Sequence, residues 1–97
     1  MPFTIELAAE AVEDLRALKA STRSIVGSAL EAHLRHAPTK TSRSRIKRLR
    51  DIDHPQYRLR IGGIRVFYDV FDQTVVVMAI VDKSEAAAWL ARFARRA

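Results

Sequence analysis

The alternation of hydrophobic and polar residues near the middle of the chain predicts a β-hairpin. Tyr57, Leu59 and Ile61 alternate with arginines, which is the period of a strand buried on one side. The dipeptide Gly62-Gly63 reaches positive φ without steric cost and suits a two-residue hairpin loop. The return strand is expected over residues 64–71.

A third strand is expected directly after this hairpin. Asp72-Gln73 is a weaker turn signal, and residues 74–81 follow it with an apolar run that is unbroken from Val75 to Val81. Such a run is typical of a strand that is covered on both faces. The three strands therefore predict a small, mainly antiparallel sheet.

The hairpin register assigns each side chain of its two strands to a face. With a glycine loop, the core face holds Tyr57, Leu59, Ile61, Ile64, Val66, Tyr68 and Val70, and the other face holds Arg58, Arg60, Arg65, Phe67 and Asp69. Arg60 then lies opposite Arg65, a like-charge pair that normally destabilises a sheet. Asp69 is about 13 Å from Arg65 at strand rise, too far to neutralise it. The two readings left open are an anion bound between the arginines and guanidiniums that point apart into solvent.

Helical periods flank these strands. A short strand over residues 3–7 precedes a helix with apolar positions Ala8, Ala11, Val12, Leu15 and Leu18, and a second helix carries the stripe Ile25, Val26, Ala29, Leu30 and Leu34. We expect Ser21 or Thr22 to cap this second helix and Pro38 to follow its end. A final helix is expected after Ser84 as its N-cap, and it either packs on the sheet edge or moves. The order is β-α-α-β-β-β-α, an α+β fold in which a helical hairpin packs on the sheet.

The balance of charge points to a polyanionic or acidic partner. The 97 residues fit a single domain, 1–97, with a net charge of +6 and no cysteine. No apolar run is long enough to span a bilayer and no signal-peptide pattern is present, so a cytoplasmic protein without a membrane role is expected. One stretch, residues 39–50, holds six basic residues and no acid: Lys40, Arg43, Arg45, Lys47, Arg48 and Arg50. This stretch is either a solvated loop or a surface that contacts nucleic-acid phosphates, and its second half is either a helical turn or an extended segment.

Other candidate sites are fewer. His33 and His36 are three residues apart, but no third ligand has suitable spacing, so neither a metal nor a cofactor is expected. Trp89 and Phe93 are large apolar residues on a short terminal helix that is not expected to bury both. We expect them to contact a partner protein or a second copy of the chain.

The segment YRLRIGGIRVFYDV, followed by the Val/Ile-rich strand, resembles the RelE/ParE toxin superfamily of bacterial type II toxin–antitoxin systems. The resemblance covers nearly the whole chain and implies the RelE-like form of the fold derived above. It also implies a cognate antitoxin that wraps the toxin. A homodimer and a toxin–antitoxin heterotetramer both remain open.

What the resemblance implies for activity depends on the branch of the superfamily. RelE-like members are ribosome-dependent messenger-RNA endoribonucleases, whereas ParE-like members inhibit DNA gyrase. The phosphate-stabilising arginines of the RelE-like group correspond here to Arg58, Arg60 and Arg65, with Lys83 as a further cation. A late arginine and a tyrosine of that group fall near Ser84 and Leu90. A nuclease toxin, a toxin that acts by binding alone, and a non-toxic antitoxin-binding module therefore stay open.

Overall fold

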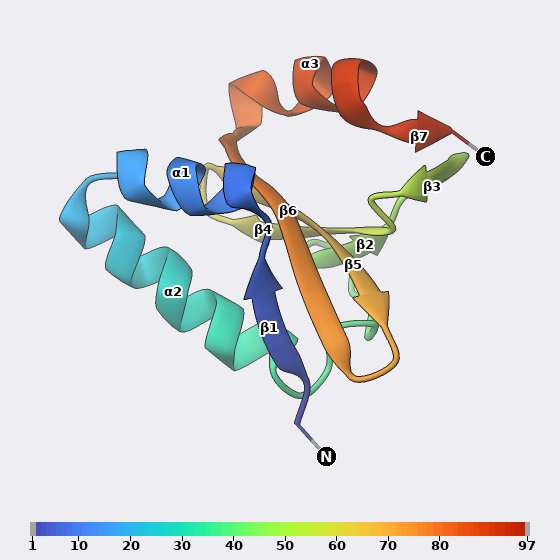
Figure 1. Ribbon diagram of the computed structural model, residues 1–97, viewed down its shortest axis with the longest axis horizontal. Coiled ribbons are helices and arrows are strands. Elements are labelled where there is room, and N and C mark those ends of the chain that lie inside the picture. The colour runs from blue at the N-terminus through green and yellow to red at the C-terminus, as the bar shows by residue number, and fades with distance from the viewer. Residues whose placement is uncertain (1, 97) are drawn as a thin grey trace.

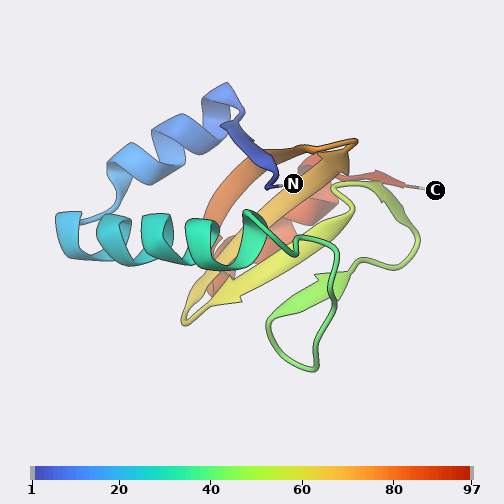
Figure 2. The ribbon, with the colours of Figure 1, turned by 90° about the horizontal axis from the view of Figure 1, so that it is seen from below.

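The computed structural model describes residues 2–96 and has an α+β fold, with a five-stranded sheet between two helical layers (Figures 1 and 2). The elements are β1 (Thr4–Leu7), α1 (Ala9–Ala17), α2 (Ala20–Leu34), β2 (Ile46–Arg48), β3 (Ile52–His54), β4 (Tyr57–Ile61), β5 (Ile64–Phe71), β6 (Thr74–Asp82), α3 (Lys83–Phe93) and β7 (Arg95–Arg96). The strand order in the main sheet is β1-β6-β5-β4-β2, and only the β1–β6 pair is parallel. Strands β3 and β7 form a separate pair. No helix of the described part is long and apolar enough to cross a membrane.

The expected order of elements is confirmed, with three short strands added. The second half of the basic stretch is extended rather than helical, because Ile46 is buried and β2 pairs with β4. Strands β3 and β7 contain only three and two residues, too few to carry a period that a sequence pattern could reveal.

The expected register of the central hairpin is confirmed. Ile61 pairs with Ile64, Arg60 with Arg65 and Arg58 with Phe67. Gly62 adopts φ of +56°, the left-handed region that glycine enters without a Cβ penalty. The pleat of β4 and β5 therefore places the arginines and the aliphatic residues on opposite faces, as the alternation predicted.

The core beneath α1 and α2 is the expected one with one exception. Val26, Leu30 and Leu34 of α2 are buried against Val66 and Tyr68. The Tyr68 hydroxyl donates a 2.6 Å hydrogen bond to the Pro38 carbonyl, which fixes the chain where it leaves α2. Ile25 was expected in this stripe, but its side chain is 60% exposed. The stripe is narrower than expected because the buried positions recur at every fourth residue, along one line of the helix.

Helix α3 covers the second face of the sheet, which corrects the expectation of an edge position. Trp89 stacks on Phe67 with ring centroids 5.0 Å apart, and Ala79 completes this second core. The Trp89 indole N–H donates a 2.7 Å hydrogen bond to Glu10 of α1. A register shift between β5 and β6, at the level of Met78, gives β6 one extra residue. Met78 and Ala79 therefore both face α3, a change of phase that the unbroken apolar run conceals.

The helix starts differ from the expected caps. Helix α2 begins at Ala20, two or three residues earlier than an N-cap at Ser21 or Thr22 would allow, and Lys19 at its N-cap makes no side-chain cap. Arg23 explains the close junction, because its guanidinium donates to the carbonyls of Leu15, Arg16 and Leu18 at the end of α1. In α3 the N-cap is Asp82, not Ser84. Its carboxylate accepts from the Ser84 amide at 2.9 Å and hydroxyl at 2.6 Å.

A side chain from α1 closes the exposed edge of β6. Strand β1 pairs with β6 only as far as Val77, so the later amides of β6 lack a strand partner on that side. The Ile80 amide donates instead to Oδ2 of Asp14 at 2.9 Å. Burial raises the pKa of this carboxyl, partly offset by the Ile80 hydrogen bond.

Candidate functional site

Basic side chains from three adjacent strands lie on the α3 side of the sheet. Lys47 of β2 is the direct cross-strand neighbour of Arg58 in β4, and Arg60 is the neighbour of Arg65 in β5. We call these four residues the arginine surface. The sequence pattern assigned Lys47 to the basic stretch without placing it beside the arginines, and its pairing with Arg58 comes from the short strand β2.

Arg58 is the most enclosed member of the arginine surface. One of its terminal nitrogens donates to the Ser44 carbonyl at 3.1 Å, while Nε is buried and has no hydrogen-bond partner among residues 2–96. Burial lowers the pKa of Arg58, and the positive charges of Arg65 and Arg60 lower it further. Because the three guanidiniums repel one another, a bound anion would be stabilised between them.

Arg65 is anchored at the glycine turn. Its Nη1 donates to the carbonyls of Gly62 at 2.8 Å and Ile64 at 3.1 Å, while the Lys83 amide donates to Gly63. The turn thus brings Lys83, the first residue of α3, to the same end of the sheet as Arg65. The side chain of Arg60 makes no hydrogen bond or ion pair within the described residues.

The nearby carboxylates only partly balance this charge. Asp82 faces the turn, and its pKa is lowered mainly by the Ser84 hydrogen bonds, with smaller effects from Lys83 and Arg65. Sequence reasoning missed Asp82 because the residue could be placed near Arg65 only through the β5–β6 register, which pairs it with Ile64. Asp69 is buried and engaged elsewhere, so it does not neutralise the arginines, as expected from its distance along the strand.

The remaining basic residues are exposed but not equivalent. Arg48 donates to the carbonyls of Leu49, Ile52 and Gln56, and its guanidinium lies 5.5 Å from the Tyr57 ring centroid. Arg45 contacts His33 at 3.0 Å, and burial together with Arg45 lowers the pKa of that histidine. No side-chain hydrogen bond or ion pair is found in the described chain for three residues: Lys40, Arg43 and Arg50. Some basic side chains of residues 39–50 therefore stabilise the fold, and others remain unpaired charges on its surface.

Ser84 and Leu90 occupy the positions where RelE-like toxins have a late arginine and a tyrosine, and neither side chain can replace those groups. Ser84 lies in the first turn of α3, where its hydroxyl bonds Asp82. Leu90 packs on the core that α3 covers. Within residues 2–96 no group of three or more histidine, cysteine or acidic side chains could hold a metal ion.

The two aromatic residues proposed as partner contacts differ in exposure. Trp89 is only 9% exposed because it stacks on Phe67, so the expectation that the helix does not bury both residues holds through Phe93 and not through Trp89. Phe93 is 50% exposed and remains available to a ligand or partner.

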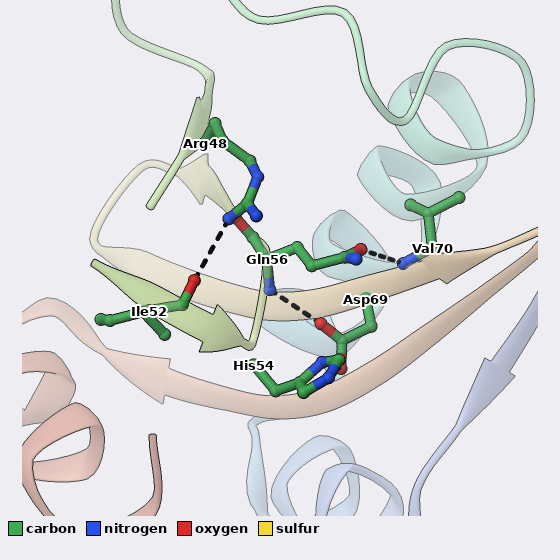
Figure 3. A network of polar contacts seen from close by, with 6 residues as sticks. All are labelled: Arg48, Ile52, His54, Gln56, Asp69 and Val70. Carbon is green, nitrogen blue, oxygen red and sulfur yellow. Dashed lines mark hydrogen bonds and ion pairs between the residues drawn. The ribbon is translucent and has the colours of Figure 1, made fainter. Parts of the chain in front are cut away.

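Sequence reasoning also missed a histidine–carboxylate pair. Nδ1 of His54 lies 3.1 Å from Oδ2 of Asp69, and the other oxygen of Asp69 accepts from the Gln56 amide (Figure 3). The two residues are far apart in the sequence, and no local spacing indicates that they meet. They lie on the same face of the sheet as the arginine surface, at the opposite end of β5.

Comparisons with known proteins agree with this architecture. The family model described as ParE toxin of type II toxin-antitoxin system, parDE, matches residues 5–87. The toxin–antitoxin complex RelBE2 from Mycobacterium tuberculosis has a chain with a TM-score of 0.72 and 24% identity, covering 84% of this chain and 99% of that chain. A chain of the RelB–RelE complex from Methanococcus jannaschii has a TM-score of 0.60 and 18% identity, covering 87% of this chain and 96% of that chain. The isolated E. coli RelE toxin has a TM-score of 0.53 and 18% identity, covering 91% of this chain and 98% of that chain. No curated protein matches significantly.

Proposed function

The chain belongs to the RelE/ParE superfamily of type II toxins, and on this premise we propose that it is a ribosome-dependent endoribonuclease that cleaves messenger RNA. The observation that carries the proposal is the arginine surface. Four cations converge on one face of a rigid sheet, and no ion pair within residues 2–96 neutralises them. Such a surface suits an RNA phosphate.

The chemistry needs little from the protein beyond position and charge. The 2′-hydroxyl oxygen attacks the adjacent phosphorus, a P–O2′ bond forms and the P–O5′ bond breaks. The hydroxyl proton passes to water or a ribosomal group, and the departing 5′ oxygen takes up a proton from the same sources. The products are a 2′,3′-cyclic phosphate and a free 5′-hydroxyl. Because RNA supplies the nucleophile, orientation and stabilisation of the developing phosphorane charge are the main tasks.

The arginines divide these tasks by their environment. Arg65 is fixed by two carbonyl bonds at the turn and suits the developing negative charge. Arg58 has a buried Nε without a hydrogen-bond partner among residues 2–96, and its guanidinium adds positive charge beside Arg60 and Arg65. Arg60 and Lys83 add positive charge at the same end of the sheet. The free charges of the basic stretch would hold the flanking RNA or ribosomal phosphates.

An antitoxin partner forms part of the proposal. Similar toxins from M. tuberculosis and M. jannaschii were crystallised as complexes with their antitoxins. With a net charge of +6, this chain would be neutralised by an acidic antitoxin that covers the arginine surface.

A toxin that acts by binding alone, on gyrase or another target, is the second candidate. It is favoured by Ser84 and Leu90, which leave the chain without the late arginine and tyrosine of RelE-like nucleases. A non-toxic antitoxin-binding module would share these gaps, and in that role an acidic antitoxin alone would neutralise the like-charged Arg60–Arg65 pair.

Induced expression without the antitoxin separates the candidates. We expect growth arrest together with new RNA 5′ ends within translated regions, mapped by primer extension. Arrest without new ends would replace the nuclease by a binding-only toxin. Normal growth, at a protein level shown by immunoblot, would favour the non-toxic module.

A further inference from the structure

A hollow of about 330 Å³ lies beyond the C-terminal end of α3, away from the arginine surface. It is lined by residues of β3, β5, β6, α3 and β7, namely His54, Asp69, Phe71, Met78, Phe93 and Arg95. Three features of this hollow bear on what it binds.

The first feature is an imidazole that lies beside a buried carboxylate (Figure 3). Asp69 is 3% exposed, and its Oδ1 accepts from the Gln56 amide at 2.7 Å. The Gln56 side chain in turn accepts from the Val70 amide at 2.8 Å, which secures the carboxylate between β4 and β5. Nδ1 of His54 is buried at 3.1 Å from Oδ2 of Asp69, although its side chain as a whole is 35% exposed. Nε2 is therefore the ring nitrogen that a ligand can reach.

The second feature is a pair of half-exposed aromatic rings. The large hydrophobic residues exposed in the described chain are Ile25, Phe71 and Phe93, and both phenylalanines line this hollow. Phe71 lies 6.0 Å from the His54 ring and Phe93 lies 5.4 Å from the Trp89 ring. Each ring therefore has one aromatic neighbour and is half exposed.

The third feature is the charge around the hollow. Arg95 lines it, and the guanidinium of Arg92 lies 5.3 Å from the centroid of the Phe93 ring. The carboxylate in the lining is Asp69, which is already engaged by His54 and Gln56. The hollow therefore presents cations and aromatic faces to a ligand, with no free acidic group in its lining.

From these features we infer that the hollow binds one nucleotide of a single-stranded RNA. The base stacks against Phe71 and Phe93, its polar edge bonds Nε2 of His54, and Arg95 contacts the phosphate. Aromatic rings beside cations are the usual means of holding single-stranded nucleic acid, because every base has a π-face. Since Asp69 and Arg65 are about 13 Å apart along β5, an RNA at the arginine surface reaches the hollow within a few nucleotides.

The inference takes RNA as the ligand from the proposed function, but it can be tested without cleavage. Trp89 is the single tryptophan of the chain and contacts Phe93, so its fluorescence reports on the hollow. The purified protein is titrated with a single-stranded RNA of about eight nucleotides, within the site sizes of single-strand-binding domains. We expect a saturable change in fluorescence, and about tenfold weaker binding for Phe71→Ala and for Arg95→Ala, comparable to losing one stacked base.

Two exposed residues outside the hollow provide matched controls. Ile25→Ala removes another exposed apolar side chain, and Arg96→Ala removes a neighbouring cation. Both variants should bind RNA as the wild type does. Unchanged RNA affinity in Phe71→Ala and Arg95→Ala would overturn the inference. So would a loss of antitoxin affinity in these variants with RNA affinity intact, since that result assigns the hollow to the protein partner. Absence of cleavage in cells would contradict the proposed nuclease while leaving this binding measurement unaffected.

Discussion

Arg60 and Arg65 face each other across the β4–β5 ladder, and neither forms an ion pair within the described part of the chain. Arg58, on the same face, adds a third guanidinium whose pKa is lowered by burial and by these two charges. The isolated protein therefore keeps a repulsive cluster of guanidiniums near the turn between β4 and β5. This arrangement is costly for folding and useful for holding an anion.

Replacing Arg60 should accordingly stabilise the free protein. Arg60→Thr removes the like charge and introduces a residue favoured in strands, so the free energy of unfolding should rise by about 0.2–1 kcal/mol at low salt. The gain should shrink at high salt, where the repulsion is screened. Urea denaturation at two salt concentrations measures both effects, with Arg43→Thr in the exposed loop as the control. A less stable Arg60→Thr protein would show that the pair is not repulsive.

Lys47 and Arg48 are adjacent basic residues, but we expect Arg48 to contribute to stability and Lys47 to RNA binding. Arg48→Ala removes the donor to three backbone carbonyls, which should lower the free energy of unfolding by about 0.5–1.5 kcal/mol. Lys47→Ala should leave stability unchanged and weaken RNA association, reducing the slope of log affinity against log salt by about 0.7. Thermal unfolding and RNA titration over a salt series test the pair. Equal effects of the two substitutions on stability would contradict this division.

Asp14 should stabilise β6 through its hydrogen bond to Ile80. Asp14→Ala leaves that buried amide without an acceptor and should cost about 1–3 kcal/mol. Asp14→Asn retains an acceptor oxygen and should recover most of the loss. Hydrogen exchange at the Ile80 amide is the direct measurement, and equal protection in the alanine variant and the wild type would disprove the bond.

The same carboxyl predicts a pH dependence with a definite sign. Burial raises the pKa of Asp14 in the folded protein, so the folded state holds its proton more tightly than the unfolded state. Its contribution to stability is therefore complete below the unfolded pKa of about 3.9 and is lost as pH rises through the folded pKa. The stability of the wild type relative to Asp14→Asn should decline over this range. An increase over the same range would mean that the pKa is lowered instead.

The local sequence pattern was enough to predict the hairpin, but it did not predict that α3 covers the second face of the sheet. The positions of Arg58, Arg60 and Arg65 follow from the pleat and the Gly62 turn, both of which are local. Helix α3 could not be placed in the same way, since the extra residue at Met78 changes the phase of β6 within an unbroken apolar run.

Contacts between residues far apart in the sequence could not be predicted from it either. His54 with Asp69, Asp14 with Ile80 and Glu10 with Trp89 depend on how separate elements cross. Lys47 could join the arginines only once β2 was known to pair with β4. These contacts decide which candidate residues are structural, such as Trp89, and which remain free to act.

The central claim is that Arg65 stabilises the phosphate during RNA cleavage, and the most direct test is the cleavage rate on ribosomes programmed with a defined messenger RNA. Arg65→Ala should lower the rate by about 10²–10³-fold, the usual cost of removing one group that stabilises developing negative charge. Arg65→Lys should recover only part of it, because an ammonium lacks the guanidinium fork. Arg16→Ala, which removes an exposed arginine of α1 outside the site, should remain within a few-fold of the wild type. Equal cleavage rates for the wild type and a folded Arg65→Ala protein would contradict the account.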